Sequence, residues 1–168
     1  MPLSDQGRRQ AEELGRRLGG HDFSRVLVSP LRRAVETCAI AGFGDRAEPC
    51  ADLREWDYGA YEGRTTPDIR AERPGWWLWA DGVPDGEPLA DLVRRVDRVI
   101  AMVRAASGDV LAFAHAHVLR VTAARWMDLD GAAGGHLTLG PATVSVLGWE
   151  REVPVMVRWN DVAGDALE

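Results

Sequence analysis

Apolar residues recur at helical spacing in two long segments of the chain. Over 89–106 they repeat at i, i+3, i+4 and i+7 with charged residues between them, which predicts an amphipathic helix. Over 5–18 they share one face opposite several arginines, after Ser4 as an N-cap and before a Gly-Gly pair that ends the helix. Both segments therefore predict helices that bury one face.

Short apolar runs between the helical segments predict buried strands. The runs at 25–29 and 109–114 are each followed by a helical pattern, at 31–41 and 118–127 respectively. A further short strand is predicted over 53–57. Because strands alternate with helices, the order favours an α/β fold with a largely parallel sheet.

The remaining segments add smaller elements. Thr66 before Pro67 predicts the capped start of a short helix. The segments 143–150 and 154–159 predict a hairpin or an adjacent strand pair, and the glycine-rich run 131–135 predicts a turn. No repeat or long linker divides the sequence, so we expect a single domain.

Composition and charge narrow the possible partners. The 168 residues are 46% hydrophobic and 27% charged, which is typical of one globular domain. A net charge of -6 argues against nucleic acid or an anionic membrane as a partner. No apolar run approaches the ~20 residues of a membrane helix, and no signal peptide is visible, so we expect a cytoplasmic location. Nothing in the pattern selects between a monomer and a homodimer.

All 20 basic residues are arginine, so any buried anion site must use guanidinium groups. Arg33 follows the first predicted strand, Glu55 lies near the end of the 53–57 strand, and His115 directly follows the 109–114 strand. Ligands of open α/β sheets gather at the carboxyl ends of strands, so these groups together favour a phosphate-processing site. Taken singly, each also fits a structural histidine, a surface ion pair or a solvated helix face.

Other chemistries have weaker support. His115 and His117 could offer two metal ligands, but no third ligand follows at a suitable spacing. Ser145 lacks the context of a hydrolase nucleophile, and no cofactor motif is present. Two interpretations stay open for a set of tryptophans, packing under a loop or lining a substrate pocket: Trp76, Trp77 and Trp79.

Five stretches match one family in order and cover nearly the whole chain: Pro2–Ala11, Val28–Ala34, Leu53–Gly63, Pro84–Glu87 and Phe113–Arg120. Through this combination the chain resembles the histidine phosphatase superfamily, in its phosphoglycerate mutase-like branch. The resemblance implies one three-layer α/β/α domain over 1–168 with a mostly parallel sheet.

The resemblance also implies roles for particular residues. In this family a histidine attacks phosphorus, and water then releases phosphate from the phosphohistidine. Arg33 matches the arginine that binds phosphoryl oxygens, His115 the second pocket histidine, and Glu55 the proton donor to the leaving oxygen. Tyr58 matches a position that often touches substrate. A donor carboxyl must hold its proton near neutral pH, and we expect burial of Glu55 to achieve this.

Two departures from the family pattern matter. The family opens with a strand ending in Arg-His-Gly, which supplies the nucleophile, whereas this sequence starts after that motif and none of its four histidines replaces it. We therefore expect the chain to be truncated at its N-terminus and to lack the first central strand. In addition, Ala116 replaces the usual glycine, which predicts strain if that residue needs a positive φ.

The leading hypothesis is a cofactor-independent phosphomonoesterase acting on a small phosphorylated metabolite, such as a sugar phosphate. Two alternatives stay open. One is a pseudophosphatase that binds a phosphorylated ligand without attacking it, and the other is phosphotransfer of the phosphoglycerate mutase kind.

Overall fold

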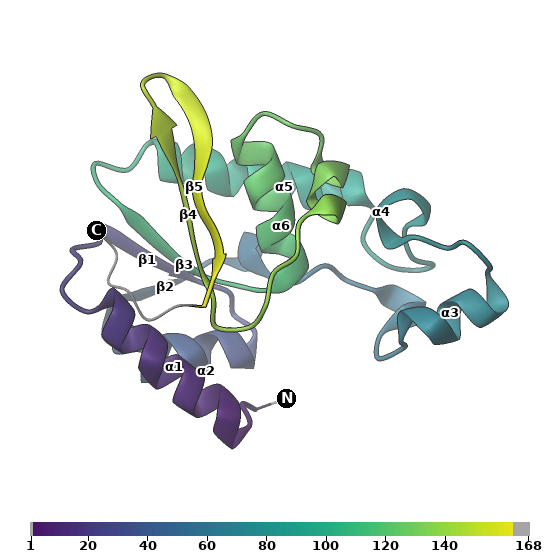
Figure 1. Cartoon of the computed structure of the whole chain (residues 1–168), viewed down its shortest axis with the longest axis horizontal. Helices are drawn as coiled ribbons and strands as arrows, with labels where there is room; N and C mark the ends of the chain where they lie inside the picture. The colour runs from purple at the N-terminus through teal and green to yellow at the C-terminus, as the bar shows by residue number, and fades with distance from the viewer. Residues whose placement is uncertain (1, 163–168) are drawn as a thin grey trace.

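A parallel three-stranded sheet forms the centre of the computed structural model, which describes residues 2–162 (Figure 1). Its strands are β1 (Arg25–Val28), β2 (Ala47–Pro49) and β3 (Val110–Phe113), in the order β2-β1-β3. The carboxyl ends of β1 and β3 lie side by side, since Val28 pairs with Phe113. The predicted parallel sheet is thus confirmed.

Helices cover both faces of this sheet. Val26 and Val28 pack toward α1 (Asp5–Leu18) and α2 (Arg32–Ile40), whereas Leu27 between them packs on the other face, against α5 (Leu89–Arg104). Figure 1 shows α1 and α2 on one side of the sheet and α5 on the other. Alternate side chains of one strand therefore fill two cores, and the expected three-layer arrangement is confirmed.

The helix after β3 begins earlier than its apolar pattern predicts. α6 covers Ala116–Trp126, and His115 is its N-cap residue. Val118 and Val121 are fully buried with α5 residues in a second core. Because helix α6 starts within three residues of the strand end, its first backbone amides lie at the carboxyl edge of the sheet.

The predicted strand over 53–57 is wrong. Residues Ala51–Leu53 form a 3-10 helix, followed by irregular backbone. The buried guanidinium of Arg95 on α5 donates to the carbonyls of Asp52 and Arg54 at 2.6 and 2.7 Å, and to that of Glu55 at 3.2 Å. These carbonyls are therefore unavailable for strand pairing, so a side chain from a distant helix overrides the local pattern.

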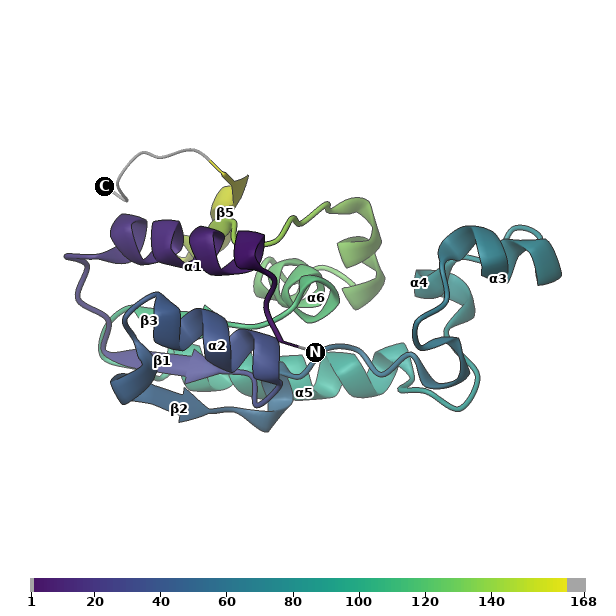
Figure 2. The same ribbon diagram turned by 90° about the horizontal axis from the view of Figure 1, so that it is seen from below.

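A lobe of two short helices projects from the body beyond the sheet edge (Figures 1 and 2). They are α3 (Thr66–Glu72) and α4 (Leu78–Asp81). The N-cap of α3 is Thr65 rather than the predicted Thr66, because Thr65 and Asp68 cap each other's backbone amides in a capping box. The glycine-rich run expected to be a turn is a 3-10 helix, Gly131–His136.

The predicted strand pair near the C-terminus is an antiparallel sheet of β4 (Val144–Glu150) and β5 (Val153–Asp161). It lies beside α6 in Figure 1, where Trp126 Nε1 donates to the carbonyl of Gly148 at 3.0 Å. Within residues 2–162, β3 pairs only with β1 and β4 only with β5, so no strand joins the two sheets. No helix in that range has both the length and the apolar character needed to cross a membrane.

Replacing Leu27 by alanine tests this layering. Leu27 is 1% exposed between β1 and α5, so Leu27→Ala should lower the free energy of unfolding by about 2–5 kcal/mol. Val35→Ala, at a position 44% exposed on α2, is the control and should change it by less than about 0.5 kcal/mol. Urea denaturation measures both, and equal losses would contradict the described core.

Candidate active site

The carboxyl ends of β1 and β3 place a serine beside the histidine that follows β3. Nε2 of His115 lies 2.8 Å from Oγ of Ser29, the residue after β1. Ser29 is fully buried, and its Oγ also accepts from the amide of Leu31 at 3.3 Å. The hydrogen bond therefore fixes the imidazole at the sheet edge where ligands of such folds bind.

Charges from two other segments converge on this imidazole. Burial is the main cause that lowers the pKa of His115, the charge of Glu55 opposes this, and the charges of Arg33 and Arg95 lower the pKa further. Arg33 and Glu55 thus lie within electrostatic range of His115, although they precede it by 82 and 60 residues in the sequence.

The guanidinium of Arg33 is available to a ligand. It lies exposed in the first turn of α2 and forms no hydrogen bond or ion pair with any residue in 2–162, whereas its neighbour Arg32 pairs with Glu36 at 2.7 Å. The amides of Arg32 and Arg33 also find no acceptor within that range, since the N-cap residue Leu31 supplies no side-chain cap. A free guanidinium beside open helix amides suits an anion.

Glu55 caps the N-terminus of α6. Its Oε1 accepts from the amides of Val118 and Trp56, both at 3.0 Å, and its Oε2 accepts from the amide of His117 at 3.2 Å. A carboxylate at this end of a helix is stabilised by the amide dipoles as well as by the hydrogen bonds. The contact attaches the irregular loop after residue 53 to the start of α6.

These contacts decide the charge of Glu55. Burial raises its pKa, but the side chain of His117 and the amides of Trp56 and His117 outweigh burial and lower the pKa to about 2. Nδ1 of His117 lies 3.8 Å from Oε2 of Glu55. The carboxyl is therefore ionised at neutral pH when no ligand is bound, and the expectation that burial keeps it protonated is wrong.

His117 is a site residue that the sequence reasoning missed. Its Nδ1 lies 2.6 Å from the hydroxyl of Tyr58, and its ring lies 5.6 Å from the rings of both Tyr58 and Trp79. Burial and the charge of Glu55 raise the pKa of Tyr58, so its hydroxyl keeps its proton at neutral pH. The available signal was a second histidine two residues after His115, which the first turn of α6 carries toward Glu55.

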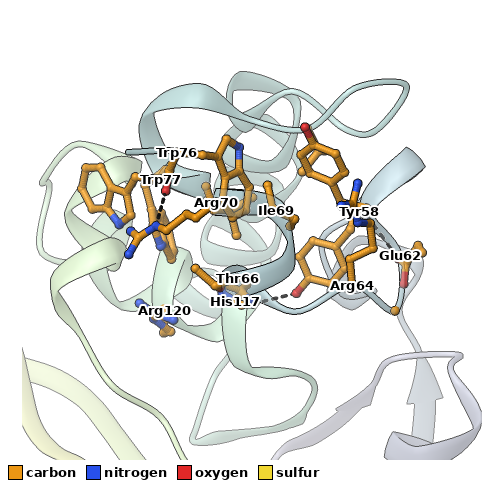
Figure 3. Close-up of a pocket in the computed structure, with 15 residues that line it drawn as sticks. Tyr58, Glu62, Arg64, Thr66, Ile69, Arg70, Trp76, Trp77, His117 and Arg120 are labelled. Carbon is orange, nitrogen blue, oxygen red and sulfur yellow. Dashed lines mark hydrogen bonds between the residues drawn. The ribbon is translucent and has the colours of Figure 1, made fainter. Parts of the chain in front are cut away.

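A cavity of about 470 Å³ is lined by His117 on one of its walls (Figure 3). Its walls come from α6 and from the lobe of α3 and α4. Aromatic and arginine side chains contribute much of the lining: Tyr58, Tyr61, Trp76, Trp77, Trp79, Arg64, Arg70 and Arg120. Trp76 and Trp79 are buried, which confirms the packing interpretation, and they also line the cavity, whose role as a substrate pocket stays a prediction.

Two further expectations concern this edge of the sheet. Ala116 is the first residue of α6 and is absent from the non-glycine residues with positive φ, so the predicted strain does not occur. Within residues 2–162 no three histidine, cysteine, aspartate or glutamate side chains are grouped to hold a metal ion.

Comparisons with known proteins agree with this geometry. The family model of the histidine phosphatase superfamily (branch 1) matches residues 1–162. The acid phosphatase of Mycobacterium tuberculosis is 39% identical over 157 residues, covering 91% of this chain and 77% of that protein. The sedoheptulose 1,7-bisphosphatase of Saccharomyces cerevisiae is 38% identical, covering 77% of this chain and 59% of the yeast protein.

A solved structure of a Mycobacterium tuberculosis open reading frame superposes with a TM-score of 0.90 at 36% identity, covering 98% of this chain and 86% of that one. The chain belongs to the histidine phosphatase superfamily, branch 1.

The ionisation of Glu55 predicts a pH dependence of stability. Its pKa falls from an ordinary 4.5 to about 2 on folding, so the ionised carboxylate stabilises the fold above about pH 5 and this contribution is lost as the pH falls toward 2. With its side chain 17% exposed, the loss should be on the order of 3 kcal/mol. Glu55→Gln should remove this pH dependence.

Urea denaturation of both proteins between pH 7 and pH 2 measures the effect. Glu72→Gln is the control, because that carboxylate is exposed and belongs to the α3 lobe. Parallel stability curves for the native chain and Glu55→Gln would show that Glu55 does not carry the proposed charge.

Proposed function

We propose that this protein is a phosphatase for monoesters of small phosphorylated metabolites, in which Arg33 and His115 hold the phosphoryl group. One observation carries the proposal: a guanidinium without a partner in residues 2–162 and a helix-bound carboxylate both act on a single partly buried imidazole at the carboxyl edge of the sheet. Phosphoryl transfer needs mainly positioning and charge stabilisation, which such a set supplies. The phosphatases among its relatives support the same class of reaction.

Each group has a distinct part in the proposed reaction. The planar fork of Arg33 and the open amides of α2 bind phosphoryl oxygens. Ser29 holds the ring of His115 in place. A bound phosphate dianion offsets the charge of Arg33, which raises the pKa of His115 and favours an imidazolium that stabilises the transferring group.

Glu55 handles protons in both halves of the proposed reaction. In the free site it is a carboxylate, and the nearby charge of a bound phosphate dianion raises its pKa so that it takes up a proton. It then gives this proton to the oxygen that leaves phosphorus. Ionised again, it accepts a proton from the water that attacks the phosphohistidine, and phosphate is released.

The attacking histidine is not among the four in this sequence. His21 pairs with Asp109 at 2.8 Å, before β3 begins and thus at the opposite end of the sheet, and His136 lies against Trp77. We infer that the nucleophile belongs to a strand between β3 and β4, because these strands are not bridged by another described strand. Leu111 on β3 and Val146 on β4 are only partly buried, which suits such an insertion.

A second function is favoured by the same sequence. Without a nucleophile, Arg33 and His115 would still bind a phosphorylated ligand, and the protein would act as a pseudophosphatase. Binding and turnover separate the two functions, so they are tested in turn.

Inorganic phosphate should bind to the 168-residue chain and raise its melting temperature. Arg33→Gln and His115→Gln should each abolish most of this stabilisation, since each removes a group that contacts the anion. Arg32→Gln is the matched control, because Arg32 is paired with Glu36 and should leave the effect unchanged. Equal stabilisation of all four proteins in differential scanning fluorimetry would rule out the proposed phosphate site.

Turnover should appear when the missing group is supplied. We expect no hydrolysis of p-nitrophenyl phosphate by the 168-residue chain in the presence of a chelator. Fusing a family-type strand that ends in Arg-His-Gly before Pro2 should produce hydrolysis, and the same fusion with Arg-Ala-Gly should not. If the histidine fusion folds and binds phosphate but stays inactive, the pseudophosphatase function is supported instead.

A further inference from the structure

Three proton-exchanging side chains meet where the sheet edge adjoins the cavity. The hydroxyl oxygen of Tyr58 lies 2.6 Å from Nδ1 of His117, and this nitrogen lies 3.8 Å from Oε2 of Glu55 (Figure 3). Tyr58 and Glu55 also interact directly: after burial, which is the main cause, the charge of Glu55 and a side-chain hydrogen bond to it raise the pKa of Tyr58. The charges of Glu62 and Arg120 act on Tyr58 more weakly and with opposite signs.

We propose that Tyr58 and His117 are positioning residues that carry protons between solvent in the cavity and the carboxyl group of Glu55. This proposal rests on the phosphatase function proposed above, in which Glu55 takes up a proton when phosphate binds and loses it again when phosphate leaves. It requires a restricted route to Glu55, a contact with solvent and a hydrogen-bond chain that can run in both directions.

The route to Glu55 is restricted by its surroundings. Its side chain is 17% exposed, and its two oxygens accept from the backbone amides of Trp56, His117 and Val118. These amides hold the carboxylate but do not give up their protons near neutral pH. Among the hydrogen-bond partners of Glu55 in residues 2–162, the side chains of Tyr58 and His117 are the groups that can exchange a proton with it.

The imidazole of His117 connects this cluster to the cavity. Its ring lies 6.2 Å from that of Trp56 and 5.6 Å from those of Tyr58 and Trp79, and these contacts fix the plane of the imidazole. His117 lines the cavity with its side chain 26% exposed, and no residue in 2–162 forms a hydrogen bond with its Nε2. Nε2 is therefore the end of the chain that exchanges protons with solvent.

The charge of Glu55 decides the direction of the chain. Next to an ionised Glu55, a proton on Nδ1 of His117 points at the oxygen of Tyr58, whose hydroxyl then donates to the carboxylate. The reverse arrangement would turn the lone pair of Nδ1 toward that carboxylate at 3.8 Å. Once Glu55 is protonated, it donates to Tyr58, and Tyr58 donates to Nδ1. The tautomer of His117 thus follows the charge of Glu55.

One proton moves inward along the chain in each transfer. Nε2 of His117 takes a proton from a hydronium ion or a buffer acid, the Nδ1–H bond breaks as its proton passes to the oxygen of Tyr58, and the hydroxyl proton of Tyr58 passes to Glu55. His117 ends as the other neutral tautomer, Tyr58 keeps one proton, and the carboxylate becomes a carboxyl group. The opposite sequence returns the proton to solvent when phosphate leaves.

¹⁵N NMR of the imidazoles in the 168-residue chain tests this coupling. The chain has four histidines, and His117→Gln assigns the resonances of His117 by their loss. We expect the Nδ1–H tautomer of His117 in the ligand-free native chain at pH 7. Glu55→Gln replaces the carboxylate by a neutral group and should shift His117 to the Nε2–H tautomer. Inorganic phosphate should cause the same shift in the native chain but not in Tyr58→Phe.

Tyr61→Phe is the matched control, because Tyr61 lines the same cavity but its hydroxyl contacts Arg73; it should respond as the native chain does. An Nε2–H tautomer in the ligand-free native chain would overturn the proposal, and this measurement decides alone if Glu55→Gln does not fold. A phosphate response of His115 without one of His117 would also overturn it. If phosphate changes neither histidine, the proposed function fails, and the comparison with Glu55→Gln still decides the coupling.

Turnover by the Arg-His-Gly fusion tests whether the coupled protons reach the leaving oxygen. His117→Gln should lower kcat for glycerol phosphate about tenfold more than kcat for p-nitrophenyl phosphate, because an alkoxide needs a proton to leave and nitrophenolate does not. Tyr61→Phe should keep the native ratio of the two kcat values. Equal losses for both substrates in His117→Gln would contradict a role in proton supply while leaving the phosphatase function in place.

Discussion

The contact between the Glu55 carboxylate and the N-terminus of α6 is the interaction on which the rest of the site depends. Three backbone amides converge on this carboxylate, two of them from the first turn of the helix. The contact holds the loop after residue 53 against α6, ionises Glu55 and brings it within range of both histidines. The sheet edge and the cavity are thereby joined through one side chain.

A buried arginine completes this anchor from the other side. The guanidinium of Arg95 donates to three carbonyls of the loop, those of Asp52, Arg54 and Glu55. The carboxylate of Glu87 accepts from the same guanidinium at 2.7 and 2.8 Å and balances its charge. The planar, five-donor guanidinium can make all these bonds at once, which an ammonium group cannot. Glu55 is thus fixed through both its backbone and its side chain.

Arginine accordingly has two roles in this lysine-free protein. Arg95 has all its charge and most of its donors satisfied inside the fold, and it organises the loop. Within the described range 2–162, Arg33 near His115 has a guanidinium without a partner, and Arg70 and Arg120 in the cavity lining beside His117 keep donors that no acceptor satisfies. The proposed recognition of anions therefore depends on which guanidinium groups the fold leaves unpaired rather than on the overall charge, which is negative.

The sequence by itself determined the elements whose stability is local or repetitive. The apolar spacing of α1 and α5, the buried runs of β1 and β3, and the positions of Arg33 and His115 after those strands all follow from it. It failed at Glu55, where it predicted a strand and a protonated acid. The contacts that decide both features come from Arg95 and the α6 amides, 40 to 63 residues away. Only the tertiary structure could bring these groups together, and with them His117 and the charged cavity.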